Sequence, residues 1–401
     1  MFTGEGPRHV DATAVSYRET VSSSHREHSD HDMQERAERW ASTMSGASSD
    51  VGVTVAHADS WAGTGETSTL SRSAREDIEN ASLSRLATRA HGAGDRERDE
   101  EPDPFRTCFE RDRDRILHAP AFRRLAGKTQ VFVFPDDHQR TRLTHALEVA
   151  QVATAVARPL GLNVALTEAI ALGHDCGHGP GGHASEDALA PYVEQGFDHA
   201  VWGADVTLQH LNLCRQTLDG IRNHSWSRPA PSTPEGEVVS WADRIAYVCH
   251  DFEDAVDARI VSLDDLPDIV TSRCGHTRGS QLSAFITSMI RAAMHTGRVG
   301  MEPPIAEALA EFRRFNYEQV YLRPESKAQA NSVIDLLRAL VDRYTEQPTL
   351  LPGGDLVDPQ SPHARFTAVS YVAGMTDRFA CRQGVTLLGW DVDRLPRGID
   401  V

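Results

Sequence analysis

The most informative stretch of the chain reads GHDCGHGPGGHASE and runs from Gly173 to Glu186. It holds three histidines and two carboxylates within fourteen residues. The apolar segment 166–172 comes directly before it and predicts a short helix that ends at Gly173. His174 and Asp175 are therefore expected at a helix end beside buried surface, where an imidazole nitrogen and a carboxylate oxygen can bind one divalent ion.

A His-Asp pair alone is most often structural, but two more predicted helices each carry a candidate ligand. His145 stands among apolar residues that recur with helical spacing, and an unpaired buried imidazole is costly. Asp243 lies in a mostly apolar turn of a helix predicted over 238–255, and a buried carboxylate needs a cation or several donors. The three elements together predict a metal site with four ligands: His145, His174, Asp175 and Asp243. Mg²⁺ or Mn²⁺ fits these mixed nitrogen and oxygen donors, and other transition metals also suit imidazole.

A candidate acid–base pair follows the glycine turn at 179–182. His183 and Glu186 are three residues apart, so on a helix they share one face. A histidine oriented by a carboxylate is a general acid or base with a pKa near neutrality. His178 adds another nitrogen close by. Its alternative roles are to support a metal ligand by a hydrogen bond or to cap a helix.

The predicted helix of Asp243 carries two more polar residues on one stripe. Tyr247 and Asp251 follow Asp243 by four and eight residues. A hydroxyl and a carboxylate at one and two turns from a metal ligand can hold a sugar. The alternative is a surface stripe that continues to Glu253 and Asp254.

The composition of the chain changes near residue 105. Residues 1–104 are rich in small and charged residues with weak apolar periodicity, which predicts a low-complexity, disordered extension. From 105 to 401 the apolar pattern is helical, with a further helix expected over 329–344, and strand alternation is scarce. We therefore expect an all-α fold, a helical bundle over 105–401 whose metal core spans about 140–260.

Charge and cysteine usage argue against several classes of protein. The net charge of −17 disfavours non-specific binding to nucleic acid. No stretch approaches the roughly 20 apolar residues of a membrane span, and no secretory signal is visible, so we expect a cytoplasmic protein without a membrane partner. The six cysteines form no CxxC pair, which disfavours a zinc knuckle. Residues 106–142 hold nine basic and five acidic residues, which indicates either an anionic ligand or a helix face with ion pairs.

In combination, these motifs resemble the bacterial deoxyguanosine triphosphate triphosphohydrolase (dGTPase) family of the HD superfamily. The resemblance covers roughly 105–385 and rests on the stretches 111–118, 122–132, 140–145, 174–186, 243–255 and 371–379. It implies an all-α HD-domain fold and metal-dependent cleavage of deoxynucleoside triphosphates to a deoxynucleoside and inorganic triphosphate. It also implies a homo-oligomer and a nucleotide at a second, activating site.

The resemblance also implies roles for individual residues. His145, His174, Asp175 and Asp243 match the metal ligands, His183 the catalytic histidine and Glu186 its orienting acid. Arg142 and His178 resemble triphosphate contacts. Tyr247 resembles a residue stacked on the sugar, and Asp251 one that faces its 3′-hydroxyl. Gln130 resembles a contact to the nucleoside, and His199 is retained from a motif of the active site.

The chain departs from the family pattern at three places, which leave base preference open. Gly181 stands where an aromatic residue is usual, Cys176 replaces a leucine, and 200–202 read Ala-Val-Trp instead of Asn-Glu-Gln. Two alternatives therefore stay beside the dNTP triphosphohydrolase. One is another HD phosphohydrolase, acting on a monophosphate, cyclic nucleotide or alarmone, and the other is a nucleotide-binding regulator with weak catalysis.

Overall fold

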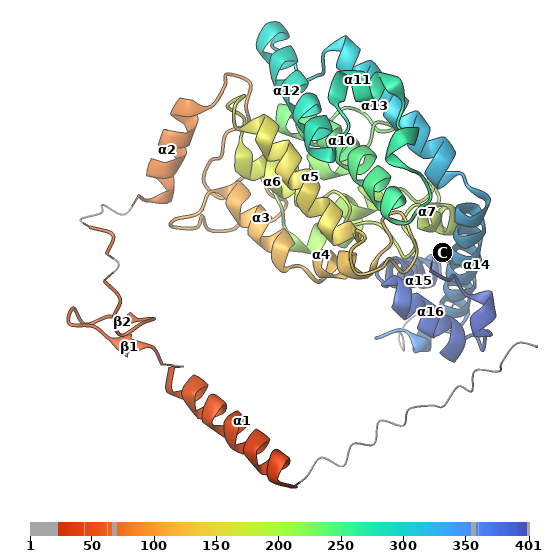
Figure 1. Ribbon diagram of the computed structural model, residues 1–401, viewed down its shortest axis with the longest axis horizontal. Helices are drawn as coiled ribbons and strands as arrows, with labels where there is room; N and C mark the ends of the chain where they lie inside the picture. The colour runs from red at the N-terminus through yellow and green to blue at the C-terminus, as the bar shows by residue number, and fades with distance from the viewer. Residues whose placement is uncertain are drawn as a thin grey trace, which may run out of the picture. The chain divides into compact units, whose positions relative to one another are not determined.

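The computed structural model describes residues 23–43, 45–61, 63–65, 70–353, 358–359 and 361–398. The chain divides into two compact units between Thr69 and Leu70. The first unit contains α1 (Ser23–Thr43) and a two-stranded antiparallel sheet of β1 (Ala47–Ser48) and β2 (Thr54–Val55) (Figure 1). Residues 1–22, 44, 62 and 66–69 of the expected extension lie outside the described residues.

The second unit is helical, and this confirms the predicted all-α fold (Figure 1). Its helices are α2 (Arg72–Ser82), α3 (Cys108–His118), α4 (Pro120–Arg124), α5 (Arg142–Ala157), α6 (Val164–Gly173), α7 (Ala184–Leu189), α8 (His199–Trp202), α9 (Arg215–Arg222), α10 (Pro234–Asp257), α11 (Asp268–Cys274), α12 (Arg278–Thr296), α13 (Pro303–Asn316), α14 (Pro324–Glu346), α15 (Pro362–Ala373) and α16 (Asp377–Thr386). A π turn at Tyr317–Tyr321 follows α13. Within the described residues of this unit, the β-type pairing is an isolated bridge between Thr129 and Thr141. No helix of the described chain is long and apolar enough to cross a membrane.

Helices α5, α6 and α10 pack against one another and form the centre of the larger core. Each helix begins at a polar residue: the Asn163 side chain accepts from Leu166 N–H before α6, and the Thr233 hydroxyl accepts from Gly236 N–H before α10. Pro234 at the first position explains why α10 begins four residues before the predicted 238. The inner faces of the three helices are apolar and closely packed, so their polar residues are held in fixed positions.

A second core lies between α7 and the C-terminal helices. Helix α14 packs against α7, α15 and α16, and its buried residues include Val333, Leu337 and Leu340. Figure 1 shows α14, α15 and α16 side by side. These helices therefore cover the glycine turn that leads into α7.

The larger unit begins earlier than composition suggested. Residues 70–104, which composition assigns to the extension, pack on the helical body: Ala87 and Ala90 are buried in the main core. The Arg96 guanidinium pairs with the buried Asp112 carboxylate at 2.6 Å, and the Thr88 hydroxyl donates to Glu235 at 2.7 Å. The polar composition of this segment predicted disorder because charged side chains, more than apolar ones, attach it to the helical body.

Candidate metal centre and active site

A cavity of about 860 Å³ opens beside α5, α10, the glycine turn and the start of α14. The predicted site residues that line it are Gln130, Arg142, His145, Asp175, His178, His183, Glu186, His199, Asp243, Tyr247 and Asp251. His174 is fully buried directly behind, in contact with both Asp175 and Asp243. The fold thus brings together residues that are up to 121 positions apart, from Gln130 to Asp251.

The four predicted metal ligands converge at the inner end of this cavity. Asp243 Oδ1 lies 3.1 Å from His145 Nε2 and 3.6 Å from His174 Nε2. His174 Nε2 lies 3.4 Å from Asp175 Oδ1. Ligands that share one ion at about 2.1 Å lie about 3.0 to 3.4 Å apart when adjacent. His145, His174 and Asp243 therefore lie close enough to share one divalent ion, and Asp175 adjoins them through His174.

The hydrogen bonds of His174 also fit a metal ligand. Its Nδ1–H donates to the Ala171 carbonyl at 2.6 Å, which leaves Nε2 as the nitrogen that faces the cluster. That nitrogen is buried and has no hydrogen-bond donor. An orphaned buried nitrogen that faces two carboxylates is the arrangement a cation would complete.

The carboxylates of the cluster are held ionised. Arg142, itself buried, donates to Asp175 Oδ2 at 2.6 Å. Although burial opposes ionisation, Arg142 and His174 hold the pKa of Asp175 well below its usual range. Burial also opposes ionisation of Asp243, but the hydrogen bond from His145 lowers its pKa. Both side chains can therefore bind a cation at neutral pH.

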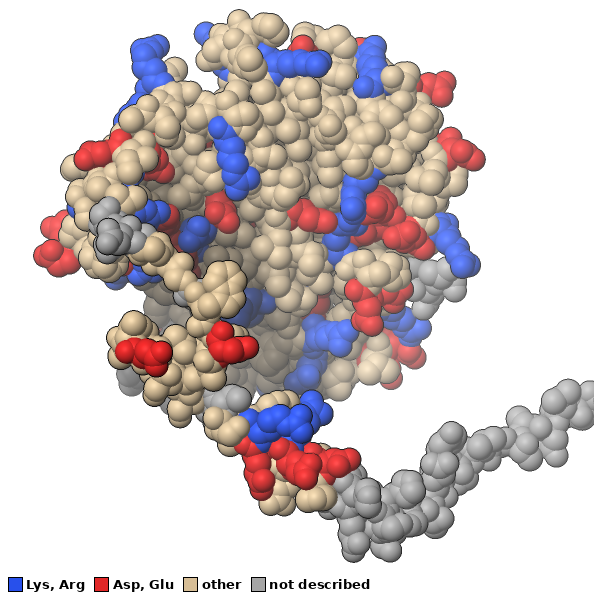
Figure 2. All heavy atoms as spheres, turned by 60° about the vertical axis from the view of Figure 1, so that its left-hand side comes forward, with Lys and Arg blue, Asp and Glu red and all other residues tan. Residues whose placement is uncertain are grey.

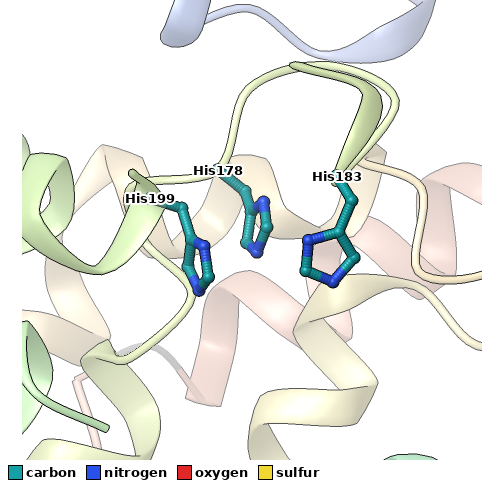
Figure 3. A group of neighbouring side chains, drawn as sticks. All are labelled: His178, His183 and His199. Carbon is teal, nitrogen blue, oxygen red and sulfur yellow. The ribbon is translucent and has the colours of Figure 1, made fainter. Parts of the chain in front are cut away.

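Three more histidines line the same cavity, and Figure 3 shows their side chains grouped together. His178 and His183 come from the glycine turn and its end, and His199 begins α8. The rings of His178 and His199 are stacked, 3.7 Å apart between centroids with an interplanar angle of 15°. Their in-plane lone pairs thus lie in parallel planes and cannot both be directed at one ion. This geometry favours acid–base and anion-binding roles over a second metal site.

Glu186 joins two of these histidines. Its carboxylate accepts from His183 Nδ1 at 3.0 Å and from His199 Nδ1 at 2.7 Å. Burial disfavours the charged imidazole, but Glu186 outweighs it and raises the pKa of His199. By contrast, burial and the nearby Arg142 hold the pKa of His178 well below its usual range. The two stacked histidines beside the predicted metal ligands thus have pKa values shifted in opposite directions.

The structure adds His224, which our sequence interpretation missed. His224 Nε2 lies 3.2 Å from His199 Nε2, and its ring contacts the ring of His174. Its Nδ1–H donates to the Ile221 carbonyl at 2.8 Å. The residue follows the short helix α9, where neither spacing nor an apolar pattern distinguishes a site histidine from a surface one.

The cavity is also lined by Tyr247 and Asp251, which lie on successive turns of α10, as predicted. Each has a partner that the sequence did not suggest. Arg313 donates to the Tyr247 hydroxyl at 2.7 Å, and the Tyr321 hydroxyl donates to Asp251 at 2.5 Å. Arg313 lies on α13 and Tyr321 in the π turn after it, so α13 completes this wall.

Comparison with known proteins identifies two domain families in the chain. The HD domain family matches residues 142–248, which contain all the predicted metal ligands, and the phosphohydrolase-associated domain family matches 299–384. A deoxyguanosinetriphosphate triphosphohydrolase-like protein from Caldanaerobacter subterraneus subsp. tengcongensis is 40% identical over 317 residues, covering 77% of this chain and 93% of its own. The chain belongs to the deoxyguanosinetriphosphate triphosphohydrolase-like family.

Other relatives in this family match a similar share of the chain. Proteins of the same name from Clostridium perfringens (strain 13 / Type A) and Desulfatibacillum aliphaticivorans are each 37% identical, covering 77% and 71% of this chain and 96% and 88% of their own. The match confirms the family that the motifs resembled. The chain is thus an HD-domain phosphohydrolase, and its His and Asp cluster can hold a divalent metal.

Proposed function

We propose that this protein hydrolyses deoxynucleoside triphosphates to a deoxynucleoside and inorganic triphosphate. The observation that carries the proposal is that one cavity is lined by metal ligands, by Arg142 and three histidines, and by Tyr247 and Asp251, which lie one and two turns along α10 from Asp243. This arrangement suits a phosphate chain at the metal and a sugar farther along α10. The names of the relatives support the same substrate class.

Residues at the inner end would act on the phosphate. A divalent ion held by His145, His174, Asp175 and Asp243, Mg²⁺ or Mn²⁺ in our proposal, would supply a Lewis acid that withdraws charge from phosphate oxygens. Arg142 and His178 would contact the triphosphate, and Arg142 would offset charge that develops on the α-phosphate. Water attacks the α-phosphorus, and the bond from phosphorus to the 5′-oxygen breaks.

The leaving 5′-oxygen needs a proton, and the histidines on Glu186 can supply it. We assign this role to His183, oriented by Glu186. His199 is the competing donor, because it is buried, shares the same carboxylate and has a raised pKa. Replacing each histidine separately distinguishes the two.

At the outer end, Tyr247 and Asp251 would hold the deoxyribose. Asp251 would face the 3′-hydroxyl, and Tyr247 would pack on the sugar ring, where a 2′-hydroxyl has less room. Gln130 would contact the nucleoside, since it lines the cavity and its side-chain oxygen is buried without a donor. A homo-oligomer, a regulatory nucleotide site and a cytoplasmic location remain predictions from the resemblance and composition.

Product analysis tests the proposal. The protein is incubated with Mn²⁺ or Mg²⁺ and each dNTP, singly and in mixtures, and the products are separated by ion-exchange chromatography. We expect deoxynucleoside and triphosphate in equal amounts. Release of pyrophosphate or phosphate without triphosphate, or hydrolysis confined to monophosphates or cyclic nucleotides, would contradict it.

A further inference from the structure

The Asp377 side chain binds the glycine turn between His178 and His183. Asp377 begins α16, and its carboxylate is buried. One oxygen, Oδ1, accepts from Gly181 N–H at 2.8 Å. The other, Oδ2, accepts from Thr129 N–H at 2.8 Å and from the Thr129 hydroxyl at 2.6 Å. One carboxylate therefore joins the turn to the segment that precedes α5.

Lys128 binds the same turn at its other end. Its ammonium donates to the His178 carbonyl and, at 3.0 Å, to the Ala373 carbonyl at the end of α15. Lys128 is only 3% exposed, and its two acceptors are uncharged backbone carbonyls. Burial lowers the pKa of its side chain to about 7, so the charged form carries a desolvation cost in this position.

Packing leaves the turn little freedom between these contacts. Gly181 has a positive φ of 72°, and a Cβ there would lie 2.5 Å from Val333 of α14. The turn thus rests on α14, α15 and α16, all of which begin within the matched phosphohydrolase-associated domain. Neither Asp377 nor Lys128 lines the cavity, so neither can reach a substrate there.

We propose that Asp377 and Lys128 are positioning residues that hold the glycine turn so that His178 and His183 face the metal centre. The C-terminal associated domain then has a defined task, which is to support a catalytic turn that belongs to the HD domain. The kinetic part of this inference rests on the proposed function, whereas its structural part concerns only how the turn is held and is measured by amide exchange.

The variant Asp377→Asn tests the contact to the turn selectively. Two donors converge on Oδ2 and one on Oδ1, so asparagine should direct its oxygen to Thr129 and its NH₂ group toward Gly181 N–H. We expect kcat to fall at least tenfold, with KM and bound Mn²⁺ within twofold of wild type. Hydrogen exchange of a peptide spanning 178–184 should be at least tenfold faster.

The matched control is Thr376→Ala, on the residue next to Asp377. The Thr376 hydroxyl caps α16 by accepting from Phe379 N–H, and its loss should lower the melting temperature by about 2 to 4 °C. It leaves the Asp377 carboxylate in place. We expect its kcat and the exchange of peptide 178–184 to remain within twofold of wild type.

If Asp377→Asn does not fold, Lys128→Met tests whether these contacts position the glycine turn. Methionine fills a similar volume without a charge but cannot donate to the His178 carbonyl, and we expect the same fall in kcat and the same faster exchange. The proposal is overturned if a folded variant keeps kcat within twofold, if the exchange is unchanged, or if Thr376→Ala loses as much activity. If wild type cleaves no dNTP, the proposed function fails, and the exchange of peptide 178–184 still decides the positioning role.

Discussion

Asp251 shows how burial prepares one side chain for a role that a surface carboxylate could not fill. It is 4% exposed, accepts from the Tyr321 hydroxyl through Oδ2, and has a second oxygen with no partner. Burial raises its pKa to about 7, although Tyr321 favours the charged form. Near neutral pH this group can therefore both donate to a hydroxyl and accept from one.

The raised pKa of Asp251 predicts a pH-dependent effect of Asp251→Asn on stability. From about pH 4 to 7 the unfolded chain releases this proton while the folded protein keeps it, so this group lowers stability as pH rises. We expect Asp251→Asn to exceed wild type in free energy of unfolding by about 1 to 3 kcal/mol at pH 8. The gain should shrink by more than half at pH 5, as measured by urea denaturation. An equal gain at both pH values would show that Asp251 has an ordinary pKa.

His183 and His174 should respond differently to replacement by alanine. His174 Nε2 lies within 3.6 Å of two carboxylates, so we expect His174→Ala to lose bound Mn²⁺ and activity together. His183 is held by Glu186 outside the ligand cluster, so His183→Ala should lose about 10² or more in kcat and keep its metal. Metal content is measured by atomic absorption after dialysis. Loss of metal from His183→Ala would show that the histidine is misassigned, and a larger kcat effect of His199→Ala would transfer the proton-donor role to His199.

At the scale of elements, the glycine turn and α14 predict a coupled pair of substitutions. Gly181→Ala puts a Cβ against Val333 and a side chain at positive φ, which should cost about 1 to 3 kcal/mol of stability. Val333→Ala removes the clashing methyl groups, so the double variant should be less destabilised than the sum of the single ones. Urea denaturation of all four proteins gives the coupling. Strict additivity would mean that the turn does not rest on α14.

The elements that sequence predicts well are those whose apolar residues repeat. The helix expected over 238–255 is α10, and it places Asp243, Tyr247 and Asp251 on one wall as the spacing required. Contacts made by single residues far apart in sequence leave no such pattern. Tyr321 meets Asp251 across 70 positions, and Asp377 meets Gly181 across 196. His224 stands in a loop, so no periodicity indicates which way it faces.

At the scale of the whole molecule, the basic stretch at 106–142 does not form a positively charged surface. The basic residues between 106 and 142 are largely engaged in ion pairs with acidic neighbours, as in Arg113–Asp114 and Arg115–Glu100. The face in Figure 2 likewise shows basic and acidic side chains interspersed. Cations that line the cavity come instead from later elements: Arg244, Arg313, Arg323, Lys327 and Arg397. Ion pairs therefore explain the basic stretch at 106–142 better than an anionic ligand does. Arg142 is the basic residue of this stretch that lines the cavity.

The boundary of the larger unit predicts which truncations retain its fold. Its core residues begin at Ala87, and Arg96 supplies the cation for Asp112, whose side chain is fully buried. Asp112 Oδ2 also accepts from Cys214 N–H and the Thr217 hydroxyl, so this carboxylate fixes the start of α9. We expect a chain that begins at Leu70 to unfold near the wild-type melting temperature.

A chain that begins at Phe105, the boundary expected from composition, lacks Arg96 and leaves Asp112 buried without its cation. Breaking a buried ion pair on one side costs about 3 to 5 kcal/mol, so this chain should be strongly destabilised or insoluble. Arg96→Met in the full chain isolates the electrostatic part and should lower the melting temperature by several degrees. Thermal unfolding followed by circular dichroism compares the four proteins. Equal stability of the chains from Leu70 and from Phe105 would show that the segment 70–104 is dispensable, because the helical body then folds without Arg96.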